Sequence, residues 1–279
     1  MKSAPHTVFH LWQNERLFNI DFASYTLSNH QFSRHFHDHY VIEFVLEGVD
    51  AFYCNGKEQT AMKDQLVMIN PGEVHTGSTI VGTPLKYFSF YPDRDKLTAI
   101  AELLHIPIAR DFNFESVLVE NKILARKFRA LFDSFQSGDR TFEEELFFDC
   151  MQSILQPHTI VPEEVVPDGR IAALIEFIRN HFTEDLSLLQ MAEVVRLNPF
   201  HLARLFRKKI GVSPYEYLLI LRVEYARRLL RSGEKVKEAA LEAGFYDASH
   251  FSRSFRKIAG MSPKFFLSSK GQYRTIFNA

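Results

Sequence analysis

The sequence predicts an α+β protein of more than one domain, with a strand-rich first half and an all-helical second half. Three observations lead to this prediction. Residues 8 to about 92 form short apolar or alternating runs separated by Gly, Pro and Asn turn signals, as in a β-barrel or sandwich. From Asp93 the apolar spacing becomes helical, and two similar stretches follow one another after residue 170. A length of 279 residues fits roughly two domains.

The strands expected in the first half are short. Asn55-Gly56 separates two of them and predicts a two-residue hairpin, because both turn positions tolerate positive φ. The clearest runs are Tyr40–Leu46, Ala51–Tyr53, Gln65–Ile69 and Tyr87–Phe90.

Three helices are expected after the strands, at Asp93–His105, Glu115–Gln136 and Thr141–Leu155. The last two form a helical hairpin, and Thr141 with Glu144 predicts a capping box at the start of the second. The apolar face of this hairpin is either core or a dimer seam, and the sequence leaves both open.

The chain is expected to divide at residues 157–169, a linker with three prolines and little to bury. Residues 1–156 then form one domain, with the barrel at 8–92 and helices at 93–156, and residues 170–279 form the other. The second domain has 19 Lys+Arg and 10 Asp+Glu, a net charge of +9, whereas the remainder has 14 and 24, a net charge of -10. The overall -1 therefore hides a basic half suited to a polyanion.

Several functional classes are not indicated. No run of about 18 apolar residues predicts a membrane span, and Met1–Trp12 lacks a signal-peptide core, so a cytoplasmic protein is expected. Cys54 and Cys150 are far apart and predict free thiols. Neither a Gly-rich phosphate loop nor a nucleophile elbow is present, so we do not expect an enzyme.

The second half contains a repeat, Leu188–Pro214 and Val236–Pro263. Each copy predicts a helix with a central alanine, a short turn, and a second helix that ends before Gly-x-Ser-Pro, which is a helix-turn-helix. Residues 214–232 predict one long connecting helix. If it holds the two second helices roughly 34 Å apart, both can enter successive major grooves on one face of DNA. Its buried face is expected to hold Leu218, Leu221, Tyr225 and Leu229, while the rest of the helix is lined by Arg222, Arg227, Arg228 and Arg231.

Residues 171–268 resemble the two-motif DNA-binding domain of the AraC/XylS transcription regulators. The resemblance rests on Ala203–Lys208, on Gly244-Phe245, on Ser249–Lys257 and on the closing Gly260–Pro263. Arg196 departs from the family, which often has Gly in this turn. The resemblance implies recognition helices in which Arg204 and Arg253 read guanine and neighbouring basic residues contact phosphates. The DNA-binding residues expected are Phe200, His201, Ala203, Arg204, Arg207, Lys208, Ala248, Ser249, Ser252, Arg253, Arg256 and Lys257.

The first half carries a histidine-rich stretch in which His37, His39 and Glu43 alternate and share one face of an extended chain. His75 follows the Pro71-Gly72 turn. This spacing resembles the two motifs of cupin barrels, and the segment resembles the cupin-type sensor domain common in the AraC/XylS family. The ligand-binding residues expected are Arg34, His37, His39, Glu43, Tyr53 and His75.

Three hypotheses fit this stretch: a metal-free small-molecule pocket, a structural polar cluster, and a divalent metal held by His37, His39, Glu43 and His75. We favour the first and assign no metal or cofactor, because the step from Glu43 to Gly48 is shorter than in the metal-binding pattern.

The sequence therefore predicts a one-component transcription regulator. A cupin-like sensor binds a small-molecule effector, the hairpin at 115–156 mediates homodimerisation or contacts the other half, and the basic half binds operator DNA. RNA polymerase is a further expected partner. The alternatives are a cupin-type metalloenzyme fused to a DNA-binding module, and a ligand-independent regulator whose first half only dimerises.

Overall fold

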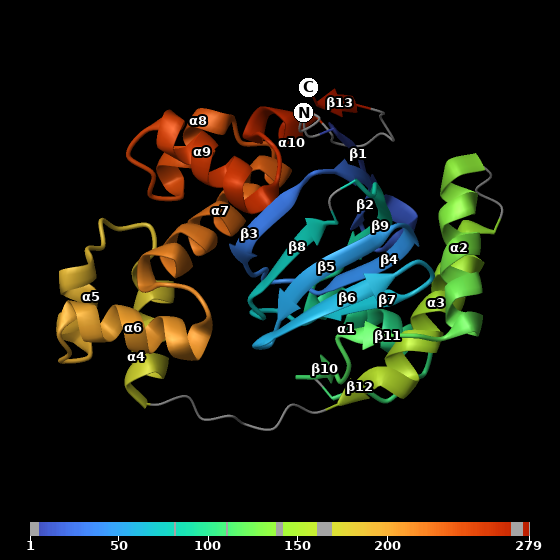
Figure 1. Ribbon diagram of the computed structural model, residues 1–279, viewed down its shortest axis with the longest axis horizontal. Helices are drawn as coiled ribbons and strands as arrows, with labels where there is room; N and C mark the ends of the chain where they lie inside the picture. Colours follow the sequence, from blue (N-terminus) through green and yellow to red (C-terminus); the bar gives the residue numbers. More distant parts are fainter. Residues whose placement is uncertain are drawn as a thin grey trace.

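The computed structural model describes residues 6–80, 82–109, 111–137, 142–160, 169–268 and 276–278. A strand-rich part lies between a helical hairpin, α2 and α3, and a group of helices formed by the second half of the chain (Figure 1). This arrangement confirms the predicted α+β class.

Two antiparallel sheets make up the strand-rich part. The larger has the order β11-β7-β4-β9-β2-β1-β13 and the smaller β3-β8-β5-β6. Asn55 and Gly56, with φ of 52° and 80°, join β5 to β6 as the predicted hairpin. The strands are β1 (His6–Asn14), β2 (Ile20–Ser28), β3 (Gln31–His35), β4 (Val41–Glu47), β5 (Val49–Cys54), β6 (Lys57–Met62), β7 (Leu66–Ile69), β8 (His75–Thr79), β9 (Leu85–Tyr91), β11 (Leu118–Val119) and β13 (Ile276–Asn278). A further short pair joins β10 (Asn113–Phe114) to β12 (Thr159–Ile160).

Alternation along β4 separates two environments. Ile42 and Phe44 point outward into an aromatic core beneath the helices, whereas Val41 and Glu43 point inward between the two sheets. In the outer core, the Phe44 ring packs against Phe128 of α2 with ring centres 5.9 Å apart. The apolar face of the hairpin is therefore core, which decides between the two possibilities that the sequence left open.

The helices of the first half are η1 (Glu15–Leu17), α1 (Arg94–Leu103), α2 (Lys122–Ser137) and α3 (Glu143–His158). The expected start of α2 at Glu115 is wrong, because β11 pairs with β7 and extends the larger sheet before the helix begins. Thr141 lies outside the described residues, and α3 begins after Phe142 without a side-chain cap. The hairpin lies across the strands from the second-half helices, so it does not supply the contact between the halves (Figure 1).

The second half is helical as predicted. Most of the expected linker, residues 161–168, lies outside the described residues, and its ends belong to helices, since α3 includes Pro157 and α4 begins at Gly169. The expectation of helix to the end is wrong, because β13 pairs with β1. The helices are α4 (Gly169–His181), α5 (Leu188–Val194), α6 (Pro199–Ile210), α7 (Pro214–Ser232), α8 (Val236–Glu242), α9 (Ala248–Ala259) and α10 (Pro263–Ser268).

Both helix-turn-helix copies form as the repeat predicted. A short turn joins α5 to α6 in the first copy and α8 to α9 in the second, and α7 connects the two copies (Figure 1). Gly211 and Gly260 end the two second helices in the left-handed conformation, with φ of 93° and 73°. None of the helices in the described part of the chain is long and apolar enough to cross a bilayer.

The face assigned to Arg222 was wrong. This side chain is buried, and its guanidinium donates hydrogen bonds to the carbonyls of Phe182 and Glu184, each at 2.6 Å. These two hydrogen bonds hold the segment that follows α4 against α7. Helical periodicity alone cannot reveal such a partner, because the two carbonyls belong to a distant loop.

The two turns carry a left-handed residue at matching places, Arg196 with φ 52° and Gly244 with φ 81°. A Cβ on Gly244 would lie 2.5 Å from the carbonyl oxygen of Thr183. We expect Gly244→Ala to destabilise the second half by about 2–4 kcal/mol, the sum of left-handed strain and the clash. Urea unfolding followed by circular dichroism measures this.

Arg196→Gly is the matched variant, and it is expected to stabilise the same half by about 1 kcal/mol, because glycine removes the left-handed strain. Unchanged stability in Gly244→Ala would show that the turn does not require glycine.

Candidate nucleic-acid interface and candidate ligand cavity

The two predicted recognition helices present their expected faces to solvent. All of the twelve predicted DNA-binding residues are exposed except Ala203, which is half-buried. The opposite faces are buried through Leu202 and Phe206 in α6 and through Phe251 and Phe255 in α9. Helical spacing therefore separated the two faces correctly, while the contacts to DNA remain a prediction.

Aromatic side chains mark the start of each recognition helix. Phe200, at the start of α6, is 87% exposed, and Tyr246, just before α9, is 96% exposed. Tyr246 was not among the residues predicted from the sequence; it lies two residues before α9 begins at Ala248.

The basic residues on these helices differ in their partners. Arg207 donates to Glu216 at 3.1 Å, and the same carboxylate caps α7 through Ser213. Arg204 and Arg253 make no ion pair within the described residues. These two guanidiniums are therefore available to a ligand outside the chain.

The helical half docks on the strand-rich half through α7. Glu224 accepts from the His37 ring at 3.2 Å, and Arg231 pairs with Asp21 at 2.6 Å. Arg228 also pairs with Asp38. Because Glu224 and His37 are both buried, this contact excludes water and differs from an exposed surface pair.

A second contact involves α9 and the turn after it. The Ser33 hydroxyl donates to the Lys257 carbonyl at 3.1 Å. The Phe32 ring packs so close to Gly260 that a Cβ at this position would lie only 2.5 Å from a ring carbon. Only glycine allows this approach. The recognition helix α9 is thus attached to β3 on one side while its predicted DNA face stays free.

A cavity of about 90 Å³ lies between the two sheets and is closed by the helical half. The sheets contribute Tyr25, Val41, Phe52 and Tyr87, and the second half contributes side chains from α7, α9, α10 and the turn between α9 and α10. Since one water needs about 10–15 Å³ of this kind of volume, the cavity holds roughly six to nine waters. The closing residues are Arg227, Arg231, Ile258, Ala259, Met261 and Phe266.

Two carboxyl groups face this cavity, Glu43 from β4 and Asp50 from β5. Burial, followed by repulsion from Asp50, raises the pKa of Glu43 well above its ordinary value, and Glu43 Oε1 accepts no hydrogen bond from the described residues. Burial raises the pKa of Asp50 to about 7, opposed by a hydrogen bond from the Ser78 amide. Near neutral pH the pair therefore retains at least one proton.

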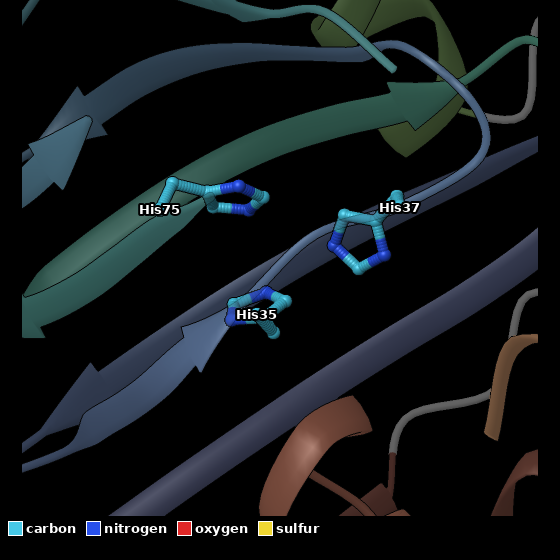
Figure 2. A group of neighbouring side chains, drawn as sticks. All are labelled: His35, His37 and His75. Atoms are coloured by element: carbon cyan, nitrogen blue, oxygen red, sulfur yellow. The ribbon is translucent and has the colours of Figure 1, made fainter. Parts of the chain in front are cut away.

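Three buried histidines lie on the cavity wall, His35, His37 and His75 (Figure 2). One nitrogen from each ring lies within 4.8 Å of the others. Burial is the main cause that lowers the pKa of all three, and repulsion between the rings adds to it for His37 and His75. The rings are therefore neutral at pH 7 and keep one lone pair each.

The predicted ligand residues do not all meet. His37, Glu43 and His75 line the cavity, whereas Arg34 stacks over the Tyr53 ring at 4.3 Å. Arg34 also donates to the Gly211 carbonyl at 3.0 Å, so it contacts the helical half outside the cavity lining.

The four-residue metal set weighed from the sequence does not form either. His39 lies beside His37 and 4.0 Å from Glu224, and Glu43 belongs to neither histidine group. The strand pattern failed here because β3 ends at His35 and residues 36–40 are not a strand. Two lining residues, His35 and Asp50, were not predicted as ligand residues. His35 is the first of three alternating histidines, and Asp50 alternates with Phe52 on the inward face of β5, so both carried a sequence signal.

Comparisons with known proteins match two separate parts of the chain. The family model described as an AraC-like ligand binding domain matches residues 17–151, and one described as a helix-turn-helix domain matches residues 191–269. The HTH-type transcriptional activator RhaS from Enterobacter sp. (strain 638) is 28% identical over 84% of this chain and 86% of its own length. An uncharacterized HTH-type transcriptional regulator, YbfI from Bacillus subtilis (strain 168), is 27% identical over 79% and 81%.

Solved structures show the same fold. Apo ToxT from Vibrio cholerae strain SCE256, as a point variant, aligns with a TM-score of 0.54 at 13% identity, covering 96% of this chain and 98% of that chain. Wild-type ToxT from the same strain with an unsaturated fatty acid bound aligns with a TM-score of 0.51 at 14% identity, covering 95% of each chain.

A ligand-binding barrel joined to a double helix-turn-helix defines a class of DNA-binding transcription regulators that respond to small molecules. The chain belongs to the AraC/XylS family of these regulators.

Proposed function

We propose that the effector binds in the cavity between the two sheets and changes how the helical half docks on the barrel. One observation carries this proposal: the cavity is lined by both halves, with Arg227, Arg231 and Phe266 closing a space formed by barrel strands. A ligand that fits better with one docking arrangement than with another shifts the population between them. DNA binding changes because α9 is attached to β3 in the docked arrangement.

The lining supports a polar effector. Glu43, Asp50 and the histidine rings offer hydrogen-bonding groups, and Tyr87 and Phe52 provide flat apolar walls. Small-molecule sites combine apolar walls with a few such polar groups. At about 90 Å³ the cavity suits a compact molecule, so a larger effector requires the helical half to move.

We further propose the roles of individual residues on DNA. Arg204 and Arg253 donate two hydrogen bonds each to guanine, while Lys208 and Lys257 contact phosphates. The other predicted residues lie on the same two exposed faces. We also propose that the protein acts in the cytoplasm as a homodimer, contacts RNA polymerase and catalyses no reaction.

The effector site is tested by a thermal-shift screen of metabolites on the full chain. A ligand present at about 100 times its Kd is expected to stabilise the protein by roughly 2.7 kcal/mol. Val67→Phe places a ring in the cavity that Val67 lines, and Ile123→Phe is the control on an exposed position of α2. A true effector loses its shift in Val67→Phe and keeps it in Ile123→Phe.

The same ligand must also change the affinity of the full chain for DNA. A ligand whose shift survives Val67→Phe, or one that leaves DNA affinity unchanged, would contradict the proposed site.

A further inference from the structure

The three histidines on the cavity wall, His35, His37 and His75, are close enough together to bind one metal ion. His35 ends β3 and His75 begins the neighbouring strand β8, while His37 lies in the segment after β3, and the three rings face a common space (Figure 2). The ring centres are 4.3 Å apart for His35 and His75, 4.8 Å for His35 and His37, and 5.2 Å for His37 and His75. Three imidazoles around a tetrahedral ion with Zn–N bonds of about 2.0–2.1 Å have ring centres about 5 Å apart.

In two of the three rings, those of His35 and His75, one nitrogen already has a partner that fixes the tautomer. Nδ1 of His35 lies 2.7 Å from the Ser33 carbonyl, and Nδ1 of His75 lies 2.9 Å from the Glu73 carbonyl. A carbonyl oxygen only accepts, so both Nδ1 atoms carry the hydrogen and both Nε2 atoms keep a lone pair. Histidines that bind metals use this arrangement, in which the remote N–H donates to an oxygen.

His37 completes the set with a carboxylate from the other half. Its Nδ1 lies 3.2 Å from Glu224 Oε1 on α7, and Arg227 pairs with the same carboxylate at 3.0 Å. The ion pair offsets the arginine charge next to the rings. An imidazole whose Nδ1–H donates to a carboxylate is a stronger metal ligand than a free one.

We propose that His35, His37 and His75 bind one divalent late first-row transition metal ion, for which Zn²⁺ is the best fit, through their Nε2 atoms, with Glu224 orienting His37. Three imidazole ligands leave a fourth position open toward the cavity, where a water or a small polar molecule can bind the ion.

The site joins metal binding to the docking of the two halves. Glu224 belongs to the helical half, and the three ligands belong to the barrel. If docking strengthens the His37 ligand, then the bound ion strengthens docking by the same factor. This coupling depends on the docking contact alone and does not require that the effector site proposed above be correct.

The test is metal binding by the full chain, purified without a histidine tag and treated with a chelator. Co²⁺ alone is titrated by its visible absorption, and Zn²⁺ is measured by competition with Co²⁺. We expect one ion per chain, with at least about 100-fold weaker binding in His35→Ala and in His75→Ala. Glu224→Gln, which retains the shape of the side chain, is expected to weaken binding by about 10- to 100-fold.

His39→Ala is the matched control, since its ring stacks on His37 with ring centres 4.7 Å apart and it does not belong to the ligand set. This variant is expected to bind within about 3-fold of the unmodified chain, well below the 10-fold change that a metal-orienting residue gives. Circular dichroism of the metal-free variants shows whether each has folded, and only folded variants are compared.

Three results would overturn the proposal: less than one ion per chain at saturation, binding that survives in a folded His35→Ala/His75→Ala double variant, or binding lost in His39→Ala and kept in His35→Ala. The last result would assign the ion to the other histidine group, formed by His37, His39 and Glu224.

Discussion

Replacing Arg204 and Arg253 together by alanine is expected to lower affinity for the preferred DNA sequence by about 30-fold to about 20,000-fold. Each bidentate arginine–guanine contact contributes about 1–3 kcal/mol of discrimination, and contacts on two separate helices add. Both guanidiniums are exposed and make no ion pair within the described residues, so alanine removes a DNA contact without breaking an internal one. Electrophoretic or fluorescence titration of the full chain at one fixed salt concentration measures the loss.

Lys208→Ala provides the matched control on the same face of α6. Loss of a phosphate contact weakens binding to all duplexes about equally and lowers the salt slope by about 1. If the double arginine variant also weakened all duplexes equally, the proposed reading of bases by Arg204 and Arg253 would be wrong.

Asp50→Asn is expected to stabilise the barrel by on the order of 4 kcal/mol at pH 8. The pKa of Asp50 rises from an ordinary value of 3.8 to about 7 in the folded state, because the group is buried beside Glu43. A raised folded pKa stabilises the fold below pH 3.8 and loses that stabilisation as pH rises to about 7, by about 1.4 kcal/mol per pKa unit. Asparagine does not ionise, so the advantage of the variant grows over this pH range.

The measurement is urea unfolding at several pH values, followed by tryptophan fluorescence. The chain has one tryptophan, Trp12, which packs in the aromatic core of the barrel, so its emission reports on this half alone. Asp133→Asn, on an exposed position of α2, is the control and is expected to change little at any pH. A gain in Asp50→Asn that does not depend on pH would contradict the buried, protonated state.

The elements that local sequence determines were predicted well. The helix-turn-helix copies, their glycine caps and their exposed faces follow from spacing, turn residues and periodicity within about 27 residues each. The burial of Arg222 and the addition of β11 to the larger sheet were not predictable, because each depends on a partner far away in the chain.

The candidate cavity was predicted only in part, for the same reason. Inward alternation on β4 placed Glu43 in the cavity lining, but extending the strand pattern back from it selected His39 and left out His35, since residues 36–40 between β3 and β4 are not a strand. Closure of the cavity by Arg227 and Phe266 depends on docking between halves more than 100 residues apart. No local pattern contains that information.

The central claim is that two helix-turn-helix units of one chain read one face of DNA. Selection of bound sequences from a random duplex library by the full chain tests it directly. We predict two enriched elements with centres about 10–10.5 base pairs apart, one lost in Arg204→Ala and the other in Arg253→Ala. Enrichment of no sequence, or of a single element that survives in both variants, would contradict this claim.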